Sequence, residues 1–367
     1  QSPDSLYEGN TAHGFLFIKS GTRCDYGYPP PAVLFFLPLA LLPLRWAFAA
    51  FILCSILLVG LGVRLIRELL DGGDGSGTDR GFWGIIMVSI LSLGPVYVTL
   101  AFGQVNALVL MCSLGYVWAV KKERFLTAGV LMGLGFWLKF YPLFLLVLAP
   151  LEKRPVRLLL ASLASIAALP ILLSPILPLD LYVHYFQAIY PGLADQTAPH
   201  VYNQSWIGLF TRLSGPKESY FSWGPVLIDP EVKTINNLLQ VVLFGWIAWG
   251  YSRNRTHKFL YYACVMTVTP MVVTYGWGGT YMLAIPLLLL AWVRLMKGGA
   301  WACAGFLLLL AVFIIPAYRP LDLVAWRGGV VEQVYYSRYL IAALVLLLVM
   351  IYRDAFGRGM AGEELRP

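Results

Sequence analysis

The chain has 367 residues, of which 59% are hydrophobic and 13% charged, and its mean hydropathy is +0.71. A typical soluble domain has about 45–50% apolar and about 25% charged residues, so the composition excludes a soluble enzyme and predicts an integral membrane protein. The net charge of +8 comes from short basic clusters between uncharged runs. This pattern is typical of membrane topology and not of a nucleic-acid-binding surface, so we expect no nucleic-acid partner. The five cysteines have neither a disulfide pattern nor metal-ligand spacing, and we expect no metal and no cofactor.

The pattern of apolar runs predicts an all-α, polytopic domain over 1–367, with about eleven hydrophobic helices, several of them short, and additional interfacial helices. A membrane span needs about 20 apolar residues. The longer runs must therefore fold back, and breaks at 103–106, 139–142 and 275–279 contain the Gly, Pro and polar residues that permit this. Runs with at most one charge cover 32–63, 83–120, 125–151, 158–179, 234–252, 259–293, 301–318 and 339–352.

The orientation follows from the basic residues, because cytosolic loops carry an excess of Lys and Arg. Six short segments hold 17 of the 27, and they include the tail 353–367, so we expect this side to be cytosolic. The long loops 1–31 and 177–233, with about 317–337, then face the other side. We therefore expect a multi-pass protein of the cell membrane whose active site faces the periplasm or the exterior. The other five basic segments are 64–82, 121–124, 152–157, 252–258 and 294–300.

Aromatic and amide side chains gather in the outer loops and at the helix breaks. A sugar needs flat aromatic faces for its C–H surface and amide or carboxylate groups for its hydroxyls. An aromatic belt at the membrane interface would explain most of the same tyrosines and tryptophans. The candidate substrate-cavity residues are Tyr28, Gln104, Asn106, Tyr141, His200, Asn203, Gln204, Trp277 and Tyr281.

Lys139 is an isolated charge between the apolar arms 125–138 and 140–151. A cation at the bilayer centre costs about 2.5–3.5 kcal/mol, so such a residue is a functional candidate. Each arm is too short to cross about 30 Å of hydrocarbon, and basic clusters follow both far ends, so we expect a hairpin with Lys139 at its tip. The alternatives are a lysine that snorkels to the interface and one tilted span. Arg212 is a second outer cation, for which snorkelling is also open.

Five motifs follow one another along the chain: Tyr28-Pro29-Pro30 leading into 38–45; Gly103-Gln104-Val105-Asn106; Ala128-Gly129 with Gly133; Lys139-Phe140-Tyr141-Pro142; and Asn203-Gln204-Ser205 followed by Arg212. In this order and spacing they resemble glycosyltransferase family 87, the polyprenyl-phosphate-mannose-dependent mannosyltransferases of the C superfamily of membrane glycosyltransferases. The resemblance covers about residues 5–290. It implies transfer of a sugar, with mannose favoured, from a polyprenyl-phosphate donor to a glycan or glycolipid acceptor, on the outer face and with inversion. Lys139 and Arg212 would then bind the donor phosphate.

Two departures from the family pattern concern the catalytic groups. The family's catalytic aspartate lies upstream of the segment that Ser5-Leu6-Tyr7 matches. We therefore expect the catalytic base upstream of Gln1, unless Asp4 or Asp25 takes its place. Many members carry a histidine after the late Ser-Trp motif, whereas 276–281 has none. We therefore expect phosphate or acceptor contacts to differ here.

Two other functional classes stay open beside the enzyme. A non-catalytic membrane subunit would retain the glycosyltransferase fold without the catalytic groups. A transporter of lipid-linked substrates would usually show paired repeats with broken helices at matching positions, and no such symmetry is visible in the sequence. In every case membrane lipid is a partner.

Overall fold

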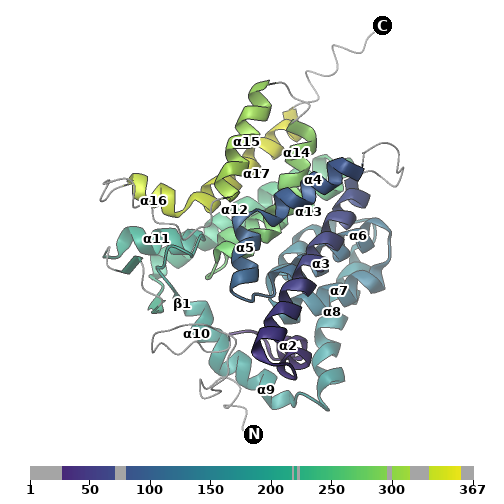
Figure 1. Cartoon of the computed structure of the whole chain (residues 1–367). Coiled ribbons are helices and arrows are strands. Elements are labelled where there is room, and N and C mark those ends of the chain that lie inside the picture. The colour runs from purple at the N-terminus through teal and green to yellow at the C-terminus, as the bar shows by residue number, and fades with distance from the viewer. Residues whose placement is uncertain are drawn as a thin grey trace. The chain divides into compact units, whose positions relative to one another are not determined.

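A computed structural model describes residues 27–70, 80–216, 219–220, 224–295, 300–314 and 330–356. Within these ranges the chain is almost entirely helical, as the sequence predicts (Figure 1). The two strands β1 (Gln196–Thr197) and β2 (Val226–Leu227) form one antiparallel pair, with Gln196 opposite Leu227. The described residues fall into two compact units: one within 1–91, 96–198 and 223–228, and one within 92–95, 199–222 and 229–367.

The first unit is a layer of packed helices in which α3 contacts α6, α6 contacts α7, and α7 contacts α8 (Figure 1). The predicted outer segment 177–233 contributes short helices to it rather than an open loop. Its elements are η1 (Pro30–Ala32), α2 (Val33–Ala40), α3 (Leu44–Leu70), α4 (Arg80–Leu91), most of α5 (Gly94–Ala101), α6 (Asn106–Lys121), α7 (Phe125–Leu138), the 3₁₀-helix η2 (Tyr141–Leu151), α8 (Pro155–Leu173), α9 (Leu179–His184), a π-helix (Tyr185–Ile189), α10 (Tyr190–Asp195) and β1 and β2.

The second unit is built around α13, whose residues are almost all buried. The buried hydroxyls of Thr267 and Thr269 in this helix donate to the carbonyls four residues earlier, so their polar groups are satisfied inside the apolar core. Helices α12, α14 and α17 pack against it. The elements are α11 (Trp206–Ser214), α12 (Pro230–Arg253), η5 (Arg255–His257), α13 (Lys258–Val272), the 3₁₀-helix η6 (Gly278–Ala284), α14 (Ile285–Leu295), α15 (Ala300–Ile314), α16 (Val330–Tyr336) and α17 (Arg338–Phe356).

Three helical segments in the described ranges are long and apolar enough to cross a membrane: Leu44–Leu70, Pro155–Leu173 and Gly278–Leu295. A fourth span results if Gly84–Leu91 and Gly94–Ala101, which meet at a 60° bend, are taken together. Several further apolar helices are shorter, so the expected number of about eleven hydrophobic helices stays a prediction. On α3, Leu53, Leu57 and Leu61 form an exposed apolar stripe at helical spacing. Such a stripe suits lipid contact and would be unfavourable in water.

The predicted hairpin around Lys139 is confirmed. Helix α7 has 14 residues and η2 has 11, and at about 1.5 and 2.0 Å per residue both arms are about 21–22 Å long. The ammonium of Lys153, after the second arm, lies 2.8 Å from the carboxylate of Glu123, before the first arm. The far ends of both arms therefore lie together, which excludes one continuous span. The second arm is a 3₁₀-helix rather than an α-helix, so its larger rise makes up for its fewer residues.

Helices α7 and α8 approach closely through small residues. A methyl group added at Gly129 would lie 2.4 Å from the carbonyl oxygen of Ala161, and one added at Gly133 would lie 3.0 Å from the backbone of Ser165. Gly129 and Gly133 are four residues apart, as are Ala161 and Ser165. Small residues at this spacing allow the backbones of two helices to pack directly in a membrane.

Each unit gathers its share of the predicted cytosolic segments at one end. In the first unit, Glu68 lies 3.8 Å from Lys122, and the Glu123–Lys153 pair joins the next two segments. In the second unit, Asp354 contacts Asn254, His257 and Arg294 and so joins 252–258, 294–300 and 353–367. This grouping agrees with the charge pattern, and the side of the membrane that these ends face stays a prediction.

We predict that Gly129→Ala lowers the thermal stability of the detergent-solubilised protein. The new methyl group would meet backbone atoms of α8, which can move only if the helices separate, at a cost of about 1–3 kcal/mol. Gly245→Ala on α12 is the matched control, because nothing lies within 4 Å of its added methyl group. Tryptophan fluorescence during heating measures the effect, and equal unfolding temperatures for the two variants would contradict the packing argument.

Candidate functional site

The lysine cluster, formed by Thr99, Gln104, Asn106 and Lys139, lies at the two helix breaks of the first unit. The Lys139 Nζ donates to Asn106 Oδ1 at 3.0 Å. The amide nitrogen of Asn106 donates in turn to Thr99 Oγ1 at 3.2 Å and to Gln104 Oε1 at 2.7 Å. Because both donors of the amide are used, its oxygen is left facing the lysine. The structure thus brings together three predicted residues from the 103–106 and 139–142 breaks.

Local sequence explains why the chain turns at both places. Gly103 adopts a positive φ of 61°, which ends α5, and α6 begins at Asn106 three residues later. At the other break Lys139 has extended backbone, and Pro142 lies in the first turn of η2. A methyl group added at Gly135 would lie 2.8 Å from Pro142 Cγ and 3.0 Å from Cys112 Cβ. Glycine at 135 therefore lets α6, α7 and η2 meet beside the lysine.

Among the described residues, Lys139 contacts only neutral partners. Its ammonium lies 4.7 Å from the ring centroid of Tyr141 and 5.8 Å from that of Tyr28, two further predicted cavity residues. Within the described ranges no carboxylate pairs with it, and two of its three N–H groups have no acceptor. A cation held among apolar helices without a counter-charge favours the binding of an anion.

A second group of predicted residues, the asparagine loop Val201–Ser205, meets the break at 275–279 in the second unit. Asn203 pairs with Trp277 in an antiparallel bridge, and the Gln204 N–H donates to the carbonyl of Gly276 at 2.8 Å. The Asn203 side chain accepts from the Gly276 N–H at 3.1 Å and donates to the Thr274 carbonyl at 3.0 Å. A methyl group added at Gly276 would lie 2.1 Å from the carbonyl oxygen of Pro270. Only glycine permits this approach.

Arg212 anchors the asparagine loop from within α11. It is fully buried and donates to the carbonyls of His200 and Asn203 at 3.2 and 2.8 Å, to Ser337 Oγ at 2.8 Å and to Gln333 Oε1 at 3.3 Å. Burial lowers its pKa to about 10, so it stays cationic at neutral pH. Four hydrogen bonds to neutral groups hold this cation in place, which is not the snorkelling geometry. Its role in binding phosphate stays a prediction.

The remaining predicted residues of this unit are core or loop contacts. Gln204 donates to the carbonyls of Val201 and Tyr336 and accepts from the Tyr339 N–H at 3.1 Å. The Tyr281 hydroxyl donates to the Gln204 carbonyl at 2.7 Å. His200 stacks on Tyr202, with ring centroids 4.8 Å apart, and its Nδ1 accepts from the Tyr202 N–H. These contacts fix the loop.

The predicted cavity residues thus form two groups, one in each unit. That both groups line a single cavity stays a prediction. Asp4 and Asp25 lie outside the described residues.

Most residues of both groups lie within the region that matches a known protein family. The model of glycosyltransferase family 87 matches residues 26–274, more than half of the chain.

The chain belongs to glycosyltransferase family 87.

A characterised relative extends the comparison. The polyprenol-phosphate-mannose-dependent alpha-(1-2)-phosphatidylinositol pentamannoside mannosyltransferase of Mycobacterium tuberculosis (strain CDC 1551 / Oshkosh) is 24% identical over 279 residues. The alignment covers 74% of this chain and 61% of the relative, so the chain spans about 61% of the length of the curated relative that it matches. The region that matches family 87 contains Lys139, Asn106, Asn203 and Arg212 and ends before Trp277 and Tyr281.

Several residues that hold these groups of the family 87 protein were missed from the sequence. Thr99 lies in an apolar helix and gives no signal apart from its hydroxyl. Gln333 and Ser337 contact Arg212 across more than a hundred residues of chain, which local patterns do not reveal. A polar residue within an otherwise apolar run is the one available signal, and it would have pointed to Thr99.

We predict a pH-dependent loss of stability that His200 causes. Burial and the charge of Arg212 lower the pKa of His200 to about 4. In the unfolded chain the pKa of this histidine is about 6.5, so the unfolded state takes up the proton first. The folded state therefore loses stability as the pH falls from about 6.5 toward about 4. His200→Asn keeps an acceptor near Nδ1 and does not titrate, so it should reduce this loss.

Unfolding temperatures of the wild type and of His200→Asn at pH 7.5 and pH 5 measure the effect. His184→Asn on α9 is the control for replacing a histidine elsewhere. An undiminished difference between the two pH values in His200→Asn would show that another group causes the loss.

Proposed function

We propose that this family 87 protein transfers a mannosyl residue from a polyprenyl-phosphate donor to a glycan or glycolipid acceptor on the outer face of the cell membrane, with inversion. Membership of the family supports glycosyl transfer. The name of the mycobacterial relative supports polyprenyl-phosphate mannose as donor and a glycolipid as acceptor. The observation that carries the proposal is Lys139, a cation at a helix break among apolar helices with two N–H groups not engaged by described residues.

The chemistry follows from the bonds that change. An acceptor hydroxyl attacks the anomeric carbon, the bond from that carbon to the phosphate oxygen breaks, and the polyprenyl phosphate leaves with a full additional charge. Lys139 stabilises this charge, because its unengaged N–H groups can donate to the departing oxygens while Asn106 holds the ammonium in position. The network through Thr99 and Gln104 fixes the orientation of Asn106, so little reorganisation is needed in the transition state.

A base must take the proton of the acceptor hydroxyl. A carboxylate near the outer membrane surface suits this step. We propose that this base is an aspartate upstream of Gln1, or alternatively Asp4 or Asp25. We propose that Arg212, which holds the carbonyls of the asparagine loop, also binds the donor phosphate.

A non-catalytic subunit is the second candidate. The lysine cluster contains no carboxylate among the described residues, and this observation favours a protein that binds the donor without turning it over. The two candidates share donor binding and differ in transfer.

We predict that Lys139→Met lowers kcat/KM for mannosyl transfer by about 100-fold or more, since the loss of one preorganised donor to a developing oxyanion has about this effect. The substitution keeps the length of the side chain and removes its charge. The assay follows radioactive mannose from polyprenyl-phosphate mannose into a glycolipid acceptor, with the full-length protein in liposomes. Lys153→Met, which removes an exposed lysine paired with Glu123, is the control and should retain activity.

Three outcomes separate the alternatives. Transfer by the wild type and its loss only in Lys139→Met support the enzyme. Donor binding that depends on Lys139 without transfer by the wild type supports the subunit. Transfer at the wild-type rate by a folded Lys139→Met protein would contradict the proposed role of this lysine.

A further inference from the structure

A groove between α12 and α17 in the second unit has no part in the proposed reaction. It has a volume of about 440 Å³, and its lining is almost entirely apolar. Trp246 and Trp249 line it from α12, and Leu348 and Tyr352 line it from α17. Trp249, Leu348 and Tyr352 are all exposed, so the groove is open to the surroundings of the protein. A volume of this size is typical of sites that take a small organic ligand.

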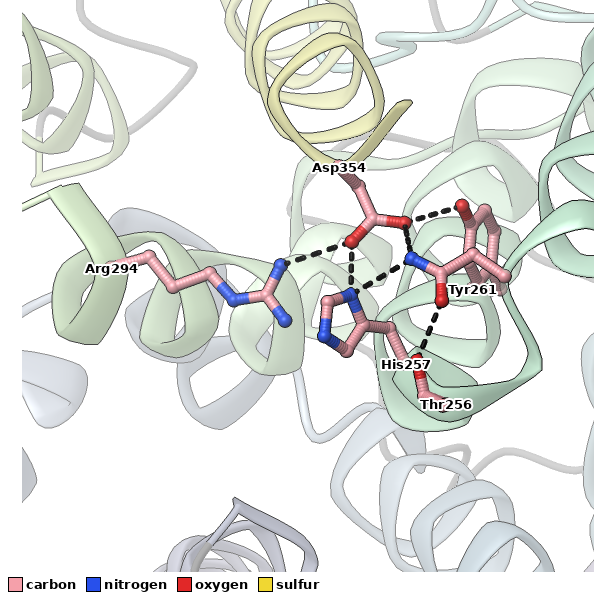
Figure 2. Close-up of polar contacts among 6 residues, drawn as sticks. Thr256, His257, Tyr261, Arg294 and Asp354 are labelled. Carbon is pink, nitrogen blue, oxygen red and sulfur yellow. Dashed lines mark hydrogen bonds and ion pairs between the residues drawn. The ribbon is translucent and has the colours of Figure 1, made fainter. Parts of the chain in front are cut away.

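A carboxylate latch fixes the two walls of the groove at one end. The carboxylate of Asp354, the residue after the groove-lining Arg353, is buried near the end of α17. It accepts from Asn254 Nδ2 and from the Tyr261 hydroxyl, each at 2.6 Å, and it contacts His257. Figure 2 shows Tyr261, His257 and Arg294 converging on this one carboxylate. The end of α17 is thereby tied to the turn after α12, so the groove exists before any ligand binds.

Two arginines lie at the latched end of the groove. Arg353 lines the groove directly. The guanidinium carbon of Arg253 lies over the ring of Trp249, 5.3 Å from the ring centroid. Both are exposed, and neither forms an ion pair with a carboxylate in the described ranges. Asp354 is engaged by the latch. An apolar groove that ends in two cations without counter-charges matches a ligand with an apolar chain and an anionic head.

We propose that this groove binds one anionic phospholipid. An acyl chain lies against Trp246, Trp249 and Leu348, and the headgroup phosphate is held by Arg253 and Arg353. The charge pattern of the sequence assigns this end of both helices to the cytosolic side, where basic pockets between membrane helices are suited to anionic headgroups. Tryptophan and tyrosine rings at the same level suit the boundary between headgroups and acyl chains.

The competing explanation is that the two arginines only snorkel to the membrane surface. Any lipid would then fill the groove, without preference for its headgroup. The two explanations differ in selectivity, which can be measured independently of mannosyl transfer.

Native mass spectrometry of the full chain, released from nanodiscs of equal parts phosphatidylglycerol and phosphatidylcholine, tests the proposal. We expect the wild type to retain one phospholipid with a preference of roughly tenfold or more for phosphatidylglycerol. The double variant Arg253→Gln with Arg353→Gln should lose most of this preference. Arg64→Gln with Arg157→Gln, which changes the net charge equally at two exposed arginines of the first unit, should retain it.

Leu348→Ala supplies a second readout. It should lower the total amount of retained lipid while the headgroup preference of the remaining lipid persists, because it removes chain contacts and leaves the arginines.

The proposal is overturned if the wild type shows no headgroup preference, or if the double variant keeps the wild-type preference. It is also overturned if lipid is retained only after residues 357–367 are removed, because the tail of the chain would then occupy the groove. Free glycerol phosphate at millimolar concentration should not displace the lipid, and displacement would mean that the site recognises the phosphate alone.

Discussion

The positive charge of Lys139, held among apolar helices, is the constraint on which the first unit depends. Its partners among the described residues are neutral, so the lysine is positioned without being neutralised. The cluster of Thr99, Gln104 and Asn106 fixes one N–H of the ammonium and leaves the others for a ligand. In the proposed function a lipid-linked phosphate would supply the missing counter-charge, and its binding would offset the cost of about 2.5–3.5 kcal/mol for a cation at membrane depth.

Local signals predicted the turning points, and long-range contacts were not accessible from sequence. The breaks after Ala101 and Leu138 were predicted, because Gly103 and Pro142 stand out in apolar runs and the arms of the hairpin are too short to span. The 3₁₀ geometry of the second arm was not predicted, since its composition also suits an α-helix. The roles of Gln333 and Ser337 were missed because each meets Arg212 only through the tertiary fold.

Helix α17 connects the two polar regions of the second unit. Near its start, the Tyr339 N–H donates to Gln204 of the asparagine loop. Asp354, fifteen residues later and about 22 Å along the helix, forms the latch with Asn254, Tyr261 and His257. The loop end uses neutral hydrogen bonds around one buried arginine, and the latch end uses one buried carboxylate. Both ends of this apolar helix are therefore fixed by satisfied polar groups.

The most direct test of the central claim is a cryo-electron microscopy structure of the full-length protein in nanodiscs with bound polyprenyl phosphate. We predict a phosphate oxygen within about 3 Å of Lys139 Nζ, with Asn106 still bound to the same ammonium. A phosphate bound elsewhere, with no oxygen within about 4 Å of this ammonium and Lys139 paired only with Asn106, would contradict the claim.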